Sequence, residues 1–160
     1  MKMLTVSLLV CALMALAAAS DVTQPEPILQ GLCPDNFFYY NGRCFRFFPD
    51  LLPWAEAEEN CMNMSANLAS VHSRDEDVFI YSMIKERDAS NPESWIGGSD
   101  CQQDNVWLWS NGKKFVHTNW GTTILPGYKH GCIVVNDGAK FRWDARECSE
   151  LRPYVCAFTM

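Results

Sequence analysis

The chain has 160 residues and a formal net charge of −6, with 48% hydrophobic and 20% charged residues. This acidic balance, with basic residues scattered along the chain, argues against a nucleic-acid partner or an anionic membrane surface. The length suits one domain with a single core, and eight cysteines in so short a chain favour a disulfide framework made in an oxidising compartment.

Residues 1–20 have the features of a signal peptide. Lys2 precedes an uncharged apolar run over residues 3–16, and small residues follow it. No later segment approaches the roughly 20 apolar residues that a membrane-spanning helix needs. We therefore expect a secreted protein without membrane insertion, in which residues 21–32 form an N-terminal arm and residues 33–160 form the folded domain.

A hairpin and a helix are predicted at the start of the domain. Aromatic residues at 37–40 lead into Asn41-Gly42, a strong hairpin turn signal, and residues 43–48 alternate on the far side. Pro53 suits the first position of a helix. Its periodicity places four residues on the core side, Trp54, Ala57, Cys61 and Met62, and three on the solvent side, Glu56, Glu58 and Glu59.

A second helix is predicted from about Arg74 to Lys85. Ser73 and Glu76 have the spacing of a capping box, which marks the helix start. The apolar face of this helix contains Phe79, Ile80, Met83 and Ile84.

Short strands and long loops follow the second helix. The predicted strands cover residues 95–98, 106–109, 133–135, 141–143 and 154–158. The stretch from about residue 113 to residue 131 is a long loop, of the kind that usually carries function. Helices followed by short strands indicate the α+β class.

These residues together resemble the C-type lectin-like domain family over most of 33–158. The resemblance rests on the 33–44 hairpin, the first helix from Trp54 to Cys61, and the segments 69–73, 95–98 and 107–112 with the last three cysteines. It is greatest with the fish secreted lectins of the ladderlectin and type II antifreeze group.

The resemblance implies a fold and a disulfide pattern. The fold would have two helices, two small antiparallel sheets and a long loop region. Three intrachain disulfides are implied, namely Cys33 with Cys44, Cys61 with Cys156, and Cys132 with Cys148. The fold hosts calcium-dependent sugar binding, calcium-free protein binding and ice binding, so the site residues must be compared one by one.

The calcium ligands of the sugar-binding members are mostly missing. Those members use a Glu-Pro-Asn or Gln-Pro-Asp triplet in the long loop, a Glu two residues before the first cysteine of the last pair, and Trp-Asn-Asp before the second. Here the loop has Leu125-Pro126-Gly127, the Glu position is His130, and the last triplet is Trp143-Asp144-Ala145. Asp144 alone survives, while calcium needs about six to eight oxygen ligands. We expect no metal or other cofactor at the sugar site.

A polar cluster remains at this surface, and it contains the candidate ligand-binding residues Tyr128, Lys129, His130, Asn136, Asp144 and Arg146, together with Asp137. One interpretation is direct recognition of a glycan or glycoprotein without metal. The other is an ordinary solvated loop whose ancestral function has decayed. Trp143 itself is expected in the core.

Two further signals concern modification and catalysis. Asn63-Met64-Ser65 is an N-glycosylation sequon at the end of the first helix, so Asn63 is a candidate acceptor whose access is open to question. His72, His117 and His130 belong to no recognisable nucleophile elbow or metal-protease sequence, so no enzyme is predicted.

Cys11 lies within the predicted signal peptide, so Cys101 is the one cysteine of the domain left over from the three implied disulfides. The positions at which the fish relatives usually provide its partner are here Gly121 and Gly131. Cys101 is therefore a candidate for an intermolecular disulfide that makes a homodimer, and the alternative is a buried or capped free thiol. A dimer would add avidity to a weak binding site.

Two functions are compatible with these observations. The first is a secreted lectin-like binder of carbohydrate on microbial or cell surfaces, acting in innate defence with little or no calcium dependence. The second is an ice-binding protein of the type II antifreeze kind, for which Thr118, Thr122 and Thr123 are suggestive. The charged Lys129 and Arg146 make the surface irregular and favour the first function.

Overall fold

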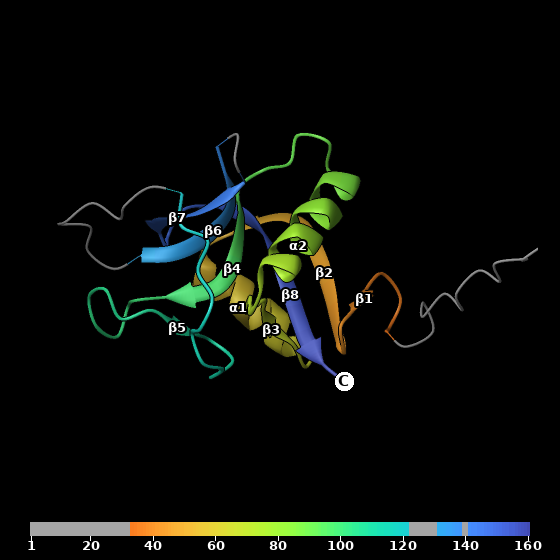
Figure 1. The fold of residues 1–160 in the computed structure, drawn as a ribbon, viewed down its shortest axis with the longest axis horizontal. Coiled ribbons are helices and arrows are strands. Elements are labelled where there is room, and N and C mark those ends of the chain that lie inside the picture. The colour runs from red at the N-terminus through yellow and green to blue at the C-terminus, as the bar shows by residue number, and fades with distance from the viewer. Residues whose placement is uncertain (1–32, 122–130, 139–140) are drawn as a thin grey trace, which may run out of the picture.

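The computed structural model describes residues 33–121, 131–138 and 141–160. The predicted signal peptide and the arm lie outside these described residues. Two helices and eight strands are present within them (Figure 1). In chain order they are β1 (Phe38–Tyr40), β2 (Arg43–Leu52), α1 (Trp54–Asn63), β3 (Asn67–Leu68), α2 (Arg74–Arg87), β4 (Ser94–Ser99), β5 (Leu108–Trp109), β6 (Gly131–Asp137), β7 (Arg142–Glu147) and β8 (Arg152–Thr159).

The strands form one sheet in the order β1-β2-β8-β4-β6-β7, with β3 paired to β8 and β5 paired to β4. Two antiparallel groups are joined by a parallel pairing of β4 with β8, in which Trp95 is opposite Tyr154. The predicted α+β class is confirmed. The expectation of two separate sheets needs one correction, because this parallel pairing connects them into a single mixed sheet.

The hairpin is confirmed at its predicted position. Asn41 and Gly42 connect β1 to β2 and have φ angles of 46° and 77°. Both angles lie in the left-handed region, which the tight turns of two-residue hairpins require and which Asn and Gly adopt most readily.

Helix α1 differs from its prediction in three residues. Pro53 is the N-cap rather than the first helical residue. Met62 is 54% exposed, whereas Glu58 is buried at 8%. The reason is helical geometry, since Glu58 lies four residues after Trp54 and three before Cys61 and so shares their face.

Helix α2 starts where the capping signal places it and ends two residues later than predicted. Ser73 Oγ accepts a hydrogen bond from the Glu76 amide at 3.2 Å. The Glu76 carboxylate accepts from the His72 amide at 2.7 Å, one residue before the amide that a capping box uses. Three of the four predicted core residues are buried, and Phe79 is half-buried against the core.

The helices cover opposite faces of the sheet. Ile80 and Ile84 of α2 belong to one core cluster with Ile133 of β6. Ala57 of α1 belongs to a second cluster with Val134, the next residue of β6. Successive strand residues point to opposite faces, so the sheet lies between α1 and α2, as Figure 1 also shows.

All three implied disulfides are present, and they pair Cys33 with Cys44, Cys61 with Cys156, and Cys132 with Cys148. The second joins α1 to β8 across 95 residues of sequence. Cys101, just after β4, is a free and exposed thiol.

Candidate functional site

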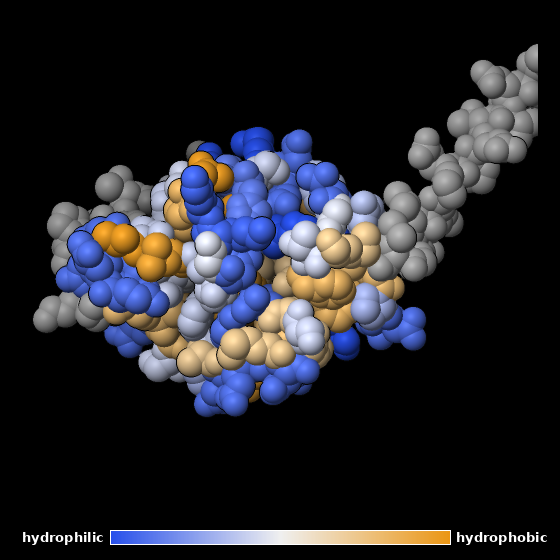
Figure 2. Space-filling view, turned by 90° about the horizontal axis from the view of Figure 1, so that it is seen from below, coloured by the Kyte–Doolittle hydropathy of each residue, from blue (hydrophilic) through white to orange (hydrophobic). Residues whose placement is uncertain are grey.

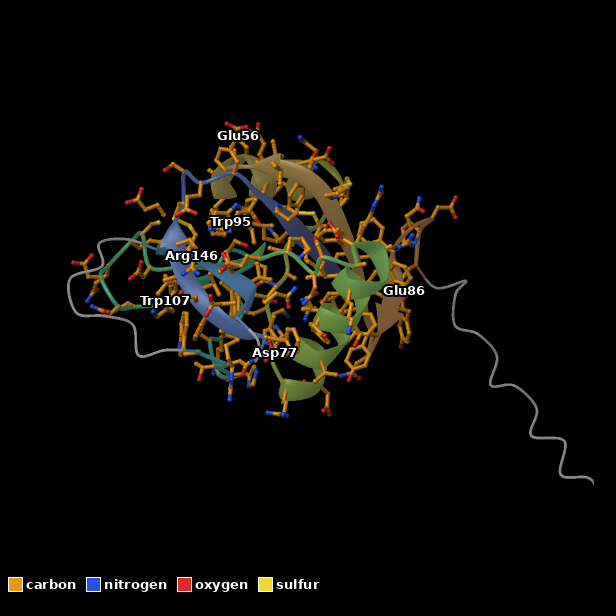
Figure 3. All side chains as sticks on the ribbon, turned by 90° about the horizontal axis from the view of Figure 1, so that it is seen from above. Glu56, Asp77, Glu86, Trp95, Trp107 and Arg146 are labelled. Atoms are coloured by element: carbon orange, nitrogen blue, oxygen red, sulfur yellow. A yellow bond between two sulfur atoms is a disulfide. The ribbon has the colours of Figure 1, made fainter. Side chains whose placement is uncertain are left out.

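Arg146 of β7 is the centre of an ion-pair cluster (Figure 3). Its guanidinium lies 2.9 Å from Glu93 Oε1 and 3.0 Å from Asp137 Oδ1, and it also pairs with Asp144. Partial burial alone would lower the pKa of Arg146, but the hydrogen bonds with Asp144 and Glu93 outweigh burial and raise this pKa above its ordinary value.

The Arg146 cluster engages the one surviving calcium-ligand residue. One carboxylate oxygen of Asp144 accepts from the Ala145 amide at 2.8 Å, and the other pairs with Arg146. Ala145 has no side-chain oxygen. Within the described residues, no three carboxylate or imidazole ligand atoms lie within 4.8 Å of one another. Both carboxylate oxygens of Asp144 are thus engaged within the protein.

Asn136 does not join this surface. It is buried, with 7% of its surface exposed, and donates hydrogen bonds to Asn91 Oδ1 at 3.0 Å and to the Pro92 carbonyl at 3.3 Å. Its φ of 69° is left-handed, which Asn tolerates better than most residues. The side chain thus holds the segment before β4 and is occupied structurally.

The other residues singled out from the sequence are partly outside the described structure, partly exposed and partly buried. Tyr128, Lys129 and His130 lie outside the described residues. Asn63 is exposed as the last residue of α1. Trp143 is fully buried, as expected.

A groove of about 400 Å³ lies between α2 and the start of β7, and sequence reasoning did not identify it. Its lining is aromatic and cationic, and consists of Arg74, Asp77, Val78, Tyr81, Asn119, Phe141 and Arg142. The rings of Tyr81 and Phe141 are 3.9 Å apart between centroids. The Arg142 guanidinium donates to Asn119 Oδ1 at 2.6 Å, which holds it at the rim.

The inner wall of the groove contains a hydrogen-bonded carboxylate. Asp77 Oδ1 accepts from Trp143 Nε1 at 2.6 Å, and Oδ2 lies 2.5 Å from His117 Nε2. Burial raises the pKa of Asp77, although the hydrogen bonds from His117 and Trp143 oppose that rise. Figure 3 shows Asp77 at the end of α2 that meets β7, away from Arg146. A period-3.6 pattern would have placed Asp77 on the α2 face next to Ile80 and Ile84.

The Cys101 thiol lies beside a disulfide. Its Sγ is 3.6 Å from Cys148 Sγ, and Cys148 is bonded to Cys132. Asp100 supports this region, because its carboxylate accepts from the Gly131 amide at 2.6 Å and from the Asn105 amide at 3.0 Å.

Together, the mixed sheet, the flanking helices and the three disulfides define a small disulfide-stabilised binding domain. The family model for the lectin C-type domain matches residues 50–158, so the chain belongs to the C-type lectin family. This family consists of binding proteins rather than enzymes, which agrees with the prediction that no catalysis occurs.

Fish proteins are among the most similar relatives. Ladderlectin of Oncorhynchus mykiss is 34% identical, with 96% of this chain and 92% of that protein covered. A type-2 ice-structuring protein of Osmerus mordax is 38% identical, with 94% and 90% covered. The solved structure of the herring type II antifreeze protein is 36% identical, with a TM-score of 0.74 over 80% of this chain and 99% of that one. The predicted resemblance to this fish group is confirmed.

Proposed function

We propose that this chain is a secreted lectin-like protein that recognises carbohydrate with little or no dependence on calcium. The observation that carries the proposal is the position of Arg146 among Glu93, Asp137 and Asp144. A calcium ion would have to displace the Arg146 guanidinium, which already forms ion pairs with all three carboxylates. Such a displacement costs the hydrogen bonds and ion pairs of a partly buried guanidinium.

The groove between α2 and β7 supports a saccharide ligand. Sugars present apolar faces and rings of hydroxyl groups, which aromatic side chains and planar polar groups recognise together. Phe141 offers an exposed ring, and Arg142 and Asn119 offer donors and acceptors beside it. Tyr128, Lys129 and His130 stay additional candidates on the loop, and ladderlectin is a lectin by name.

A glycan array tests this proposal when it is probed with calcium and again with a chelator. We expect the same glycans to be bound in both conditions. Phe141→Ala and Arg142→Ala should each weaken binding about tenfold, which corresponds to about 1.4 kcal/mol. Lys114→Ala, an exposed cation outside this groove, is the matched control and should leave affinity unchanged. Glycan binding that the chelator abolishes would contradict the proposal.

Ice binding is the second candidate, because several of the similar proteins carry antifreeze or ice-structuring names. Ice binding favours a flat and regular face. Figure 2 shows one face of the molecule, on which apolar residues lie in separate patches with polar residues between them. The charged cluster around Arg146 argues against a weakly charged, regular surface and favours the lectin function. A thermal-hysteresis measurement on the same sample separates the two, since hysteresis without glycan binding would promote the ice-binding candidate.

The proposal includes secretion of the protein and its assembly as a disulfide-linked homodimer. Neither of the described helices is long and apolar enough to cross a membrane. With the predicted signal peptide, this supports a secreted protein that meets glycans or glycoproteins on microbial or cell surfaces in innate defence. The exposed Cys101 supports a disulfide-linked homodimer. A single band at monomer mass in non-reducing electrophoresis would contradict the dimer.

A further inference from the structure

Three cysteine sulfurs meet at one edge of the sheet. Cys132 of β6 is opposite Ser99 of β4 on one side and Arg146 of β7 on the other. Cys101 follows Ser99 by two residues, and Cys148 follows Arg146 by two. The strand register therefore brings all three cysteines together, and their sulfur atoms lie within 4.8 Å of one another.

The chemistry of this cluster follows from its bonding. Two of the sulfurs share a disulfide bond, so the cluster is no thiolate site for a metal. The third sulfur is a thiol 3.6 Å from Cys148 Sγ. A thiolate next to a disulfide sulfur is the reacting pair of thiol–disulfide exchange.

We propose that Cys101 and the Cys132–Cys148 disulfide form an internal thiol–disulfide exchange centre. The Cys101 thiolate attacks Cys148 Sγ, the Cys101–Cys148 bond forms, and the Cys132–Cys148 bond breaks. The electron pair leaves with Cys132 as a thiolate, which takes up the proton that Cys101 lost. One disulfide replaces another, so the step needs no oxidant or reductant. In-line attack requires a rotation of the Cys101 side chain, and its exposure permits this.

The exchange changes which thiol is accessible. Cys101 is exposed, whereas Cys132 is completely buried. A free Cys132 would lie in the core, where a cysteine behaves as a small apolar residue. Exchange thus moves the odd thiol from the surface into the interior. The exchanged form has no exposed thiol among the described residues, so it competes with the homodimer for Cys101.

Peptide mapping of the full oxidised chain tests the proposal. The protein is held at pH 8, blocked with N-ethylmaleimide and digested with trypsin and a glutamyl endopeptidase. Lys113, Lys140 and Glu150 follow the three cysteines in turn, so the digestion separates them and also separates Cys148 from Cys156. We expect a Cys101–Cys148 peptide beside the Cys132–Cys148 peptide. Exchange should slow at pH 5, because the thiolate is the attacking species. Two controls should give the Cys132–Cys148 peptide alone. In one, Cys101 is blocked with N-ethylmaleimide before the pH 8 step, and in the other Cys101 is replaced in the Cys101→Ser variant.

A second variant keeps the test independent of the equilibrium between the two forms. Cys132→Ser removes the competing partner, and we expect it to form Cys101–Cys148 and to show no thiol that reacts with N-ethylmaleimide. The proposal is overturned if this variant folds with Cys101 and Cys148 both free. It is equally overturned if the parent chain at pH 8 shows only labelled Cys101 and the original disulfide.

Discussion

Buried charged residues connect segments that are far apart in the sequence. Arg43 at the start of β2 donates to Glu76 Oε1 at 3.0 Å and to the Ser70 carbonyl at 2.9 Å, and both partners are buried. Glu58 of α1 accepts from the Leu68 amide and from Asn67, each at 2.6 Å, and from Ser110 Oγ at 3.1 Å. These carboxylates are fully hydrogen-bonded, which is the condition under which burying them is tolerated.

Glu58→Ala should destabilise the protein by about 2 to 3 kcal/mol, because it leaves the buried Leu68 amide without an acceptor. Glu58→Gln keeps one acceptor oxygen and should cost less. Urea denaturation followed by tryptophan fluorescence measures both. Glu59→Ala, on the exposed side of α1, is the control and should change little. Equal losses for Glu58→Ala and Glu59→Ala would show that the Glu58 hydrogen bonds contribute nothing.

His72 should make stability depend on pH. Burial lowers the pKa of His72, the Arg43 charge lowers it further, and Glu76 only partly opposes them. The unfolded chain binds a proton near the ordinary histidine pKa of about 6.5, and the folded chain binds it at lower pH. Acidification below about pH 6.5 therefore favours unfolding. His72→Gln should flatten the fall in unfolding free energy between pH 7.5 and pH 5, and an unchanged slope would contradict this.

At the scale of elements, β4 lies so close to its neighbours that two of its positions have no room for a side chain. A Cβ at Gly97 would lie 2.5 Å from the Leu68 carbonyl oxygen of β3. A Cβ at Gly98 would lie 2.3 Å from the Ile133 Cδ1 atom of β6. The two glycines thus let β4 approach β3 on one face and the Ile133 side chain on the other.

Gly97→Ala and Gly98→Ala should differ in whether a second substitution rescues them. Both should destabilise the fold by about 1 to 3 kcal/mol through overpacking. Ile133→Val removes the atom nearest to the Gly98 Cβ and should recover part of that loss. No side-chain change removes the Leu68 carbonyl, so Gly97→Ala should not be recovered by Ile133→Val. Thermal unfolding is measured for each glycine variant alone and combined with Ile133→Val. Equal rescue of both glycine variants by Ile133→Val would refute the assignment of the contacts.

At the scale of the whole molecule, the disulfides differ in the length of chain that each one closes. Cys33 and Cys44 are separated by 11 residues, whereas Cys61 and Cys156 are separated by 95. In the chain-entropy model a longer loop restricts the unfolded chain more. The long disulfide also joins α1 to β8, a strand that pairs with β2, β3 and β4.

Replacing both cysteines of each pair by alanine should show this difference. We expect a loss of about 4.7 kcal/mol for the Cys61–Cys156 pair and about 3 kcal/mol for the Cys33–Cys44 pair. Guanidinium denaturation of the two variants measures it. A larger loss for the short loop would mean that effects in the folded state outweigh the entropy of the unfolded chain.

Much of the fold was predictable because local signals decide local structure. The Asn41-Gly42 turn, the Ser73 cap and the apolar periodicity of α2 each act over a few residues, and all three were located correctly. Strand β3 is not predicted, because a strand of two residues is too short to show an alternating pattern of apolar and polar residues. The prediction that Glu58 faces solvent is wrong, because its spacing from Trp54 and Cys61 places it on the buried face of α1 despite its charge.

By itself, the sequence determined the resemblance to the lectin-like class, both helices and the hairpin, because these depend on residue identity and short spacings. Tertiary structure decided what the remaining residues do. Asn136 became a buried structural residue, Arg146 an internal cation, and Cys101 a thiol beside a disulfide. These outcomes depend on strand register and on packing between segments 44 to 53 residues apart, as in the Cys101–Cys148 contact across 47 residues. No local pattern specifies such contacts.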